Sequence, residues 1–265
     1  MSVLDPEVLT TVRELPMRSK ARRAFIARTV ERPIRRSLEI GALNVPTILP
    51  GECDARFLDW FSTDELRARH QNNPVVPPDS IVPIDHVVAD RAFSEQIDDT
   101  FDLIIANHVI EHVPDLIYWF DQLARISEPD GRLLLSVPDR RYTFDYYRTE
   151  DDAVDVMRAS ADGLERPSRY DIAKHLYYFM PIDHREIWSG TPPPEFTPRM
   201  SFAEALDQAG SLSEKYTDVH CWVFTQESFV HMLEALGSAG LVAWRLEEVE
   251  PVQNGENEFR VLLRR

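Results

Sequence analysis

Short apolar runs alternate with helical patterns along the first half of this chain, and no other sequence feature restricts the fold as much. Residues 37–41, 56–60, 101–106 and 132–137 are such runs, each of strand length. Between the last two, residues 114–126 repeat apolar side chains with the period of a helix. Near-continuous aliphatic strands separated by helices are typical of a parallel sheet covered on both faces. Right-handed crossovers then give a doubly wound α/β fold.

The alternation stops after residue 139, where the chain changes character. Residues 140–220 are rich in aromatic, acidic and proline residues and contain no clear buried strand. We expect helices and loops there, inserted over the carboxyl edge of the sheet. Residues 228–239 then form an amphipathic helix, and residues 241–249 and 259–263 form a terminal antiparallel hairpin. The predicted fold is a Rossmann-like, doubly wound, mainly parallel sheet with this hairpin at its C-terminal end.

Three further elements complete the prediction. Residues 6–30 carry a helical, amphipathic pattern, and residues 84–89 form a third short strand. A helix follows the second strand, with Ser62 or Thr63 as its cap and Glu65 in its first turn.

The composition excludes several classes of protein. No apolar run is long enough to cross a bilayer, and the first residues lack the pattern of a secretory signal, so we expect a cytoplasmic protein without a membrane span. The two cysteines, Cys53 and Cys221, have no metal-type spacing. The net charge of −16 opposes polyanions, so no nucleic acid partner is expected.

Functional side chains are expected where the strands end. In an open parallel sheet, the ligand crevice lies beyond the carboxyl ends of the strands. The strand ends therefore select the candidate binding residues Gly41, Ala42, Asp59, Trp60, Asp90, Arg91, Ala92, Asn107, His108 and Asp139. A nicotinamide dehydrogenase is the main alternative for such a fold, but the segment after Leu38 lacks the Gly-x-Gly-x-x-Gly turn of that class.

Two long stretches of the chain resemble a known family. Residues 101–113, FDLIIANHVIEHV, are similar to the fourth strand and following turn of the class I S-adenosylmethionine-dependent methyltransferases. Residues 123–138, LARISEPDGRLLLSVP, are similar to the helix, turn and fifth strand of the same family. Glu39-Ile40-Gly41, Asp59 and Asp90 are also arranged as in that family, although its first motif usually carries more glycines.

The resemblance implies a role for each residue on the cofactor side. Gly41 lets the backbone approach the methionine part of S-adenosylmethionine, Asp59 accepts hydrogen bonds from the ribose hydroxyls, and Asp90 faces the adenine amino group. Asn107 and His108 line the cleft near the sulfonium. The implied cofactor contacts are Glu39, Gly41, Ala42, Asp59, Trp60, Asp90, Arg91, Ala92, Asn107 and His108.

The length suits a single methyltransferase domain over residues 1–265. Its expected parts are an N-terminal helical segment (1–36), a cofactor-binding core (37–139), an acceptor-site insertion (140–220), and a C-terminal helix and strand hairpin (221–265). The N-terminal helix and residues 191–198 are candidate contacts of a homodimer, and each is equally suited to packing on its own chain.

An acceptor hydroxyl must lose a proton during methyl transfer, which requires a general base or a metal. His108, Asp139 and His220 are the acceptor-side candidates for catalysis, and which histidine acts as the base is left open. Alternate side chains of an extended segment share a face, so Asp218 and His220 are expected to converge as an Asp–His pair. With Asp139, this pair is also a candidate Mg²⁺ site; a structural hydrogen-bonded pair is the alternative.

The aromatic residues of the insertion favour a sugar as the methyl acceptor. Aromatic faces pack on sugar rings while charged groups bind hydroxyls, although many of these side chains are also expected to form the insertion's own core. Residues 137–145 and 218–225 resemble methyltransferases of bacterial polysaccharide and glycan biosynthesis, among them the mycobacterial sugar O-methyltransferases that act on methylated mannose polysaccharides. We therefore expect O-methylation of a carbohydrate hydroxyl on a small-molecule, oligosaccharide or polysaccharide precursor. Methylation of a small lipid or aromatic metabolite and a non-catalytic cofactor-binding protein are the alternatives.

Overall fold

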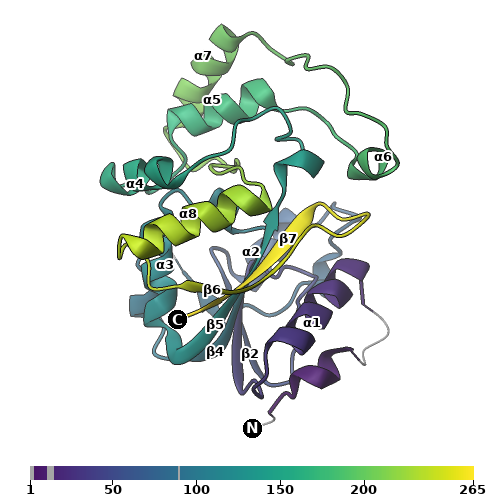
Figure 1. The fold of residues 1–265 in the computed structure, drawn as a ribbon, viewed down its shortest axis with the longest axis vertical. Helices are drawn as coiled ribbons and strands as arrows, with labels where there is room; N and C mark the ends of the chain where they lie inside the picture. Colours follow the sequence, from purple (N-terminus) through teal and green to yellow (C-terminus); the bar gives the residue numbers. More distant parts are fainter. Residues whose placement is uncertain (1–2, 11–14, 89) are drawn as a thin grey trace. The chain divides into compact units, whose positions relative to one another are not determined.

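The computed structural model describes residues 3–10, 15–88 and 90–265. Within these ranges, seven strands form one sheet in the order β3-β2-β1-β4-β5-β7-β6 (Figure 1). The strands are β1 (Arg36–Ile40), β2 (Asp54–Asp59), β3 (His86–Val87), β4 (Phe101–Asn107), β5 (Ser127–Pro138), β6 (Arg245–Glu250) and β7 (Glu258–Arg264). The pairs β1–β2, β1–β4 and β2–β3 are parallel, and β6 and β7 are antiparallel. The predicted doubly wound, mainly parallel sheet with a C-terminal antiparallel pair is confirmed.

The helices of the described residues follow the predicted order, with some changes in their bounds. The α-helices are α1 (Met17–Thr29), α2 (Thr63–Arg69), α3 (Leu116–Arg125), α4 (Ala153–Ala161), α5 (Arg169–Tyr178), α6 (His184–Trp188), α7 (Phe202–Leu212) and α8 (Gln226–Ser238). Short 3-10 helices lie at Pro6–Thr10, Pro78–Ser80, Phe93–Gln96, Ile110–His112 and Arg140–Tyr142. No helix among the described residues is both long and apolar enough to span a membrane.

Local sequence signals explain where α2 begins. The Ser62 side chain accepts a hydrogen bond from the backbone N–H of Glu65, and the Glu65 carboxylate accepts one from the backbone N–H of Ser62. This reciprocal capping box satisfies backbone donors that the first turn of a helix leaves unpaired. The predicted cap at Ser62 is therefore confirmed.

Two predicted elements are corrected. A continuous helix over residues 6–30 is wrong, because a 3-10 helix ends at Thr10 and α1 begins only after Pro16, which lacks the N–H that a helix interior requires. Residues 11–14 of that prediction lie outside the described residues. The third strand is only two residues long, since β3 lies at the edge of the sheet and pairs with β2 alone; Ala89, the expected end of that strand, is not among the described residues.

The chain divides into two compact units, and strands β5 and β7 contribute residues to both. Unit 1 comprises Met1–Asn107, Asp121–Leu135 and Leu262–Arg265. In its core, Phe25 and Ile26 of α1 pack against Leu103 and Ile105 of β4, so α1 covers one face of the strands of this unit. Burial of these aliphatic and aromatic side chains is the main stabilising contribution.

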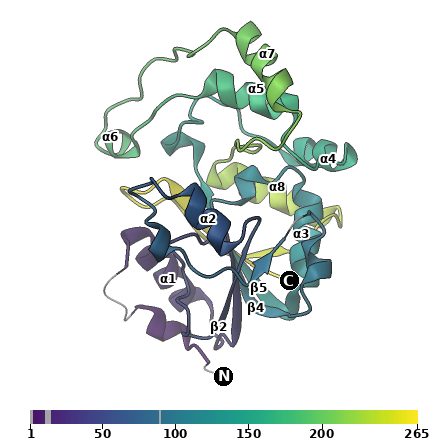
Figure 2. The ribbon, with the colours of Figure 1, turned by 180° about the vertical axis from the view of Figure 1, so that it is seen from behind.

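Unit 2 comprises His108–Phe120 and Ser136–Val261, and it contains the whole predicted insertion. As predicted, residues 140–220 are helices and loops without a strand of the sheet. Helices α5 and α7 lie side by side, with Ile172, Ala209 and Val219 in a small core of their own (Figure 1). A long segment without regular structure joins α6 to α7, as the reverse view shows (Figure 2).

Candidate functional site

The loop that follows β1 in unit 1 is built around a buried carboxylate. Glu39 is 2% exposed and accepts hydrogen bonds from the backbone N–H of Thr47 (2.6 Å) and from its hydroxyl (2.9 Å). The Asn107 side-chain amide at the end of β4 donates to the same carboxylate (2.9 Å). Glu39 thus joins the ends of the neighbouring parallel strands β1 and β4 to the loop that follows β1. Its contacts are with the protein, and a direct contact with a cofactor stays a prediction.

The turn after Glu39 requires glycine. Gly41 has a φ of 65°, in the left-handed region that L-residues with a side chain rarely adopt. Its backbone N–H donates to the carbonyl of Leu58 in β2 (3.0 Å), which fixes the turn against the next strand. The adjacent Ala42 is buried and packs against Phe57 and Val82.

Two further acidic residues follow the next strands of unit 1. Asp59 ends β2 and accepts a hydrogen bond from the backbone N–H of Phe61 (3.1 Å), and burial raises the pKa of its carboxyl. Asp90 follows β3 and accepts from the backbone N–H of Ala92 (2.8 Å). Trp60, which is 55% exposed, directly follows Asp59 in the sequence, and Arg91 directly follows Asp90. Carboxylates at successive strand ends are suited to accept hydrogen bonds from hydroxyl and amino groups of a nucleoside.

Burial also raises the pKa of Glu39, to about 7, although the hydrogen bonds from Thr47 act in the opposite direction. A carboxyl group in an apolar interior loses its hydration when it ionises, so the neutral form is favoured. Glu39 therefore titrates near neutral pH.

Unit 2 contains a cluster of histidines around one buried glutamate. Glu111 lies in the 3-10 turn after β4 and its side chain is 1% exposed. Its Oε1 atom lies 3.5 Å from Nδ1 of His108, 3.8 Å from Nε2 of His112 and 4.0 Å from Nε2 of His220. We call these four residues the histidine cluster.

Each histidine of the cluster has its second ring nitrogen next to another carboxylate. Nε2 of His108 lies 2.7 Å from Oε2 of Glu258. Nδ1 of His112 lies 2.8 Å from Oδ1 of Asp218. Nδ1 of His220 lies 2.6 Å from Oδ2 of Asp145. These contacts fix the orientation of each ring and direct its other nitrogen toward Glu111.

The expected pairing of Asp218 with His220 is therefore wrong. Asp218 pairs with His112, and His220 pairs with Asp145. The rule of alternating side chains fails here because residues 216–220 have no regular strand geometry. The backbone instead follows the neighbouring turn: the N–H of Cys221 donates to the carbonyl of Glu111 (2.7 Å).

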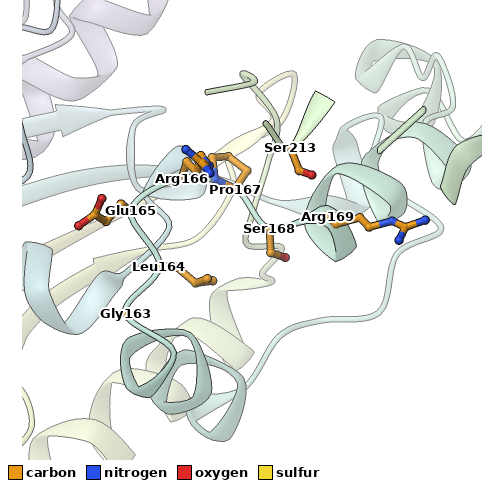
Figure 3. A pocket seen from close by; sticks show the side chains of 8 residues that line it. All are labelled: Gly163, Leu164, Glu165, Arg166, Pro167, Ser168, Arg169 and Ser213. Carbon is orange, nitrogen blue, oxygen red and sulfur yellow. The ribbon is translucent and has the colours of Figure 1, made fainter. Parts of the chain in front are cut away.

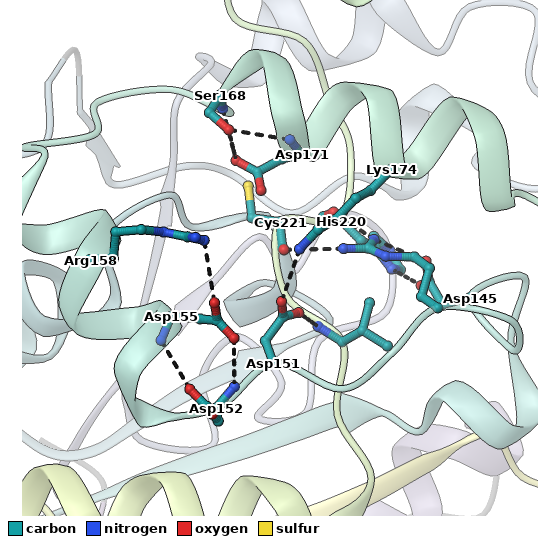
Figure 4. Close-up of polar contacts among 12 residues, drawn as sticks. Asp145, Asp151, Asp152, Asp155, Arg158, Ser168, Asp171, Lys174, His220 and Cys221 are labelled. Carbon is teal, nitrogen blue, oxygen red and sulfur yellow. Dashed lines mark hydrogen bonds and ion pairs between the residues drawn. The ribbon is translucent and has the colours of Figure 1, made fainter. Parts of the chain in front are cut away.

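A buried arginine holds this segment in place. The Arg148 guanidinium donates to the carbonyl of His220 (2.8 Å), to the carbonyl of Cys221 (3.2 Å) and to Oδ1 of Asp145 (3.1 Å). Nearby, Asp151 accepts from Lys174 (3.2 Å) and from the backbone N–H of Val223 (Figure 4). His220 is consequently held at two points: Asp145 contacts its ring, and Arg148 donates to its backbone carbonyl.

The electrostatics of the cluster follow from burial and from these carboxylates. Burial would lower the pKa of His108, but the hydrogen bonds and charges of Glu111 and Glu258 outweigh it and raise that pKa to about 9. The pKa of His112 is also raised, since Asp218 and Glu111 outweigh burial. Burial dominates for His175, whose pKa falls to about 4. The cluster thus holds a charged imidazole, that of His108, at neutral pH, while the imidazole of His175, outside the cluster, is neutral.

Asp139, predicted as a catalytic or metal-binding residue, is engaged elsewhere. Its side chain is fully buried, and its two oxygens accept from Nε (2.9 Å) and Nη2 (2.7 Å) of Arg141. Asp139, Asp218 and His220 each pair with a different neighbour, so the structure does not assemble them as a ligand set. Glu111 and Glu258 were missed as site residues, and Asp145 was not among the selected catalytic residues. Glu258 is the first residue of β7, a strand that also carries Arg260 and Arg264, so its charge gave no distinct signal.

The aromatic side chains of the insertion divide into two groups. Tyr177, Tyr178, Phe196 and Phe202 contact one another and form internal packing of the insertion. Phe144 lies against the rings of both His220 (4.6 Å between centroids) and Phe179 (4.8 Å). Separately, Tyr142 and Trp188 stack with ring centroids 4.7 Å apart, and both are partly exposed.

A pocket of about 330 Å³ lies elsewhere in unit 2, between α4 and α5 (Figure 3). It is lined by residues 163–169 and Ser213. Ser168 is occupied as the cap of α5, where it bonds to Asp171. None of the predicted site residues lines this pocket.

Comparison with known proteins gives a family match. A family model described as a methyltransferase domain matches residues 56–241, well over half of the chain. A comparison with curated protein sequences finds no match.

Several solved structures are similar over most of the chain. A mitomycin 7-O-methyltransferase is 14% identical, with a TM-score of 0.40 and coverage of 94% of this chain, which spans only 57% of that protein. An S-adenosylmethionine-dependent methyltransferase from Mesorhizobium loti is 15% identical, with a TM-score of 0.41 and coverage of 88% of this chain and 91% of the other. A Burkholderia thailandensis 1,6-didemethyltoxoflavin-N1-methyltransferase is 13% identical, with a TM-score of 0.47 and coverage of 94% and 78%.

Proposed function

The chain belongs to the methyltransferase-domain family and is an S-adenosylmethionine-dependent methyltransferase, and we propose that it methylates a hydroxyl group of a carbohydrate. The observation that carries the proposal is the histidine cluster of unit 2, in which three imidazoles surround one buried carboxylate. A hydroxyl acceptor must give up its proton, and imidazoles are the side chains best suited to receive one near neutral pH.

On the cofactor side, the residues of unit 1 fit the chemistry of S-adenosylmethionine. In this proposal Asp59 accepts hydrogen bonds from the ribose, Asp90 contacts the adenine, and the turn at Gly41 admits the methionine part. The positive φ of Gly41 and the half-buried carboxylate of Asp59 support these roles. When bound, the cofactor supplies an electrophilic methyl group on a sulfonium, and the protein's contribution is to position the two reactants.

On the acceptor side, His220 is proposed to receive the hydroxyl proton, while His108, which its pKa of about 9 keeps protonated at neutral pH, is proposed to supply positive charge beside the acceptor. The Asp145 carboxylate orients the His220 ring through its Nδ1 atom, and Glu258 does the same for His108 through Nε2. Such orientation matters because it places the other ring nitrogen in one direction before the substrate arrives. Asp139 is proposed to act indirectly, by holding the guanidinium of Arg141.

A carbohydrate is favoured over an apolar acceptor by the side chains that unit 2 offers. The Tyr142–Trp188 stack presents partly exposed aromatic rings of the kind that pack on sugar rings. The histidines and acids of the histidine cluster, elsewhere in unit 2, would supply hydrogen-bonding partners for hydroxyls, whereas a lipid or aromatic metabolite would require an apolar lining.

The test is to incubate the purified protein with cofactor labelled in its methyl group and a panel of mono- and oligosaccharides, with lipid and aromatic hydroxyl compounds in parallel. We expect label in a sugar O-methyl ether. Replacing Trp188 with alanine should raise KM for the sugar about fivefold, since stacking of one ring contributes about 1 kcal/mol. Tyr170→Ala, at a ring that is 74% exposed, is the matched control. Transfer only to a lipid, a protein or an aromatic metabolite would reject the carbohydrate assignment.

A further inference from the structure

We propose that Glu111, His112 and His220 bind one divalent transition-metal ion, with zinc as the representative. One donor atom from each residue lies within 4.8 Å of the donors of the other two, and all three residues belong to unit 2. Binding of the ion would hold whatever the methyl acceptor is. It would occupy Nε2 of His220, so in the metal-loaded protein His220 acts as a ligand and not as the base of the proposed function.

The distances between the donor atoms suit an ion better than direct hydrogen bonds. Nε2 of His112 and Nε2 of His220 lie 3.8 Å and 4.0 Å from Oε1 of Glu111. Both separations are too long for a hydrogen bond. Donors that share one zinc ion at about 2.0–2.2 Å lie roughly 3–3.5 Å apart. All three donors lie within 4.8 Å of one another, so small rotations of the side chains would bring them to this separation.

The buried carboxylate of Glu111 points to a missing partner. Its side chain is 1% exposed, and apart from the long contact of Oε1 with Nδ1 of His108 (3.5 Å), neither of its oxygens has a hydrogen-bond partner among the described residues. A buried charged group is costly unless something satisfies it, and a metal ion is one of the few groups that can. The buried carboxylate of Glu111 is therefore evidence for a bound ion that is independent of the clustering of the three residues.

The carboxylates behind the histidines complete the arrangement. Asp218 lies 2.8 Å from Nδ1 of His112, and Asp145 lies 2.6 Å from Nδ1 of His220. Each imidazole therefore turns Nε2 toward Glu111, and the two rings meet edge to face with centroids 4.8 Å apart. Histidines that ligate metals commonly have a carboxylate on the second ring nitrogen, which fixes the tautomer and strengthens the ligand.

The donor set also selects the kind of ion. Two imidazole nitrogens and one carboxylate are typical of zinc and other transition metals, whereas Mg²⁺ prefers a shell of oxygens and water. This set differs from the Mg²⁺ ligands expected from the sequence, which were Asp139, Asp218 and His220. Three protein ligands leave a coordination position open, as in catalytic rather than structural zinc sites.

The experiment uses full-length protein without a histidine tag, freed of metal with a chelator. Titration calorimetry with zinc chloride should give one ion per chain, with no comparable binding of magnesium chloride. Cobalt(II) should give the visible absorption of a site with nitrogen and oxygen ligands. Absence of zinc binding by the folded protein, or equal affinity for magnesium, would overturn the proposal.

Variants locate the site. Glu111→Gln, His112→Gln and His220→Gln should each weaken zinc binding by well over tenfold, while Asp145→Asn, which acts through His220, should weaken it about 10- to 100-fold. The exposed His231 on α8 provides the matched control, and His231→Gln should bind as the native chain does. Unchanged affinity in the three ligand variants would contradict the assignment.

If the variants fail to fold, a measurement on the native protein tests the site instead. In the native protein, NMR spectra of the imidazole nitrogens should show zinc-dependent shifts at Nε2 of His112 and His220 and none at His231. Shifts at His231, or none at the two proposed ligands, would count against the site as directly as the variants.

Discussion

Nδ1 of His220 lies 2.6 Å from Oδ2 of Asp145, although 75 positions separate the two residues in the sequence. The other oxygen of Asp145 accepts from Arg148, which also donates to the carbonyl of His220. One guanidinium therefore holds both members of the pair. The orientation of the His220 ring depends on Asp145, and this dependence can be tested without altering the histidine itself.

Replacing Asp145 with asparagine should lower kcat for methyl transfer about 100-fold or more, because the amide cannot stabilise the same state of the His220 ring. KM for S-adenosylmethionine should stay within a factor of about two, since the proposed cofactor contacts Gly41, Asp59 and Asp90 lie in unit 1. Steady-state kinetics with each substrate varied in turn measures both effects. Asp207→Asn, at an exposed position of α7, is the control. A change in the cofactor KM alone would show that Asp145 does not act on the acceptor side.

Gly41→Ala should destabilise the chain and also impair cofactor binding. At a φ of 65°, a residue with a Cβ atom costs about 1–2 kcal/mol. Gly255, in the turn between β6 and β7, has a φ of 85° and no neighbour within 4 Å of an added Cβ atom. Gly255→Ala should therefore lose a similar free energy of unfolding but keep the affinity for S-adenosylhomocysteine. Urea unfolding and calorimetry separate the two effects; equal affinities in both variants would remove Gly41 from the cofactor site.

Asp59→Asn should weaken binding of S-adenosylhomocysteine by about tenfold or more, because a hydrogen bond to a charged acceptor contributes about 1.5–3 kcal/mol. The fold should tolerate the change, since the amide oxygen can still accept from the N–H of Phe61. Asp64, whose side chain is 97% exposed, is the matched control. Calorimetry on both variants decides the matter, and equal affinity for the two would exclude a role for Asp59 in ribose recognition.

Most of the sheet could be predicted from the sequence, because buried parallel strands leave a direct pattern of aliphatic residues. The runs at residues 101–106 and 132–137 lie within β4 and β5. The N-terminal region could not be predicted in the same way, since the amphipathic pattern of residues 6–30 continues across Pro16 while the helix does not. The type of each element thus followed from the periodicity, whereas the break in the N-terminal helix depended on the backbone N–H that Pro16 lacks.

The candidate site was less predictable than the fold. His108 and His220 were identified individually, but their partners Glu258 and Asp145 lie 150 and 75 residues away. Such pairs arise from the packing of irregular segments, for which no periodicity exists. The Asp218–His220 pairing failed for this reason: it assumed an extended segment, and the chain there follows the turn at Glu111 instead.

The buried Glu39 couples the stability of unit 1 to pH. Its pKa is raised from 4.5 to about 7, chiefly by burial. Between these two values, the folded protein holds a proton that the unfolded chain has released. The free energy of unfolding must therefore fall as the pH rises through this range. The usual salt-bridged carboxylate behaves in the opposite way, because its pKa is lowered on folding.

Glu39→Gln should flatten this dependence. For the native chain, the contribution of Glu39 is a decrease on the order of 1 kcal/mol per pH unit between about pH 5 and pH 7, present in full at low pH and lost as the pH approaches 7. Urea unfolding at several pH values measures the slope for both chains. Glu234→Gln, at an exposed position of α8, should keep the native slope. Because the glutamine cannot ionise, any remaining dependence in Glu39→Gln belongs to other groups. A slope identical to that of the native chain would mean that Glu39 stays ionised in the folded protein, held by Thr47 and Asn107 despite its burial.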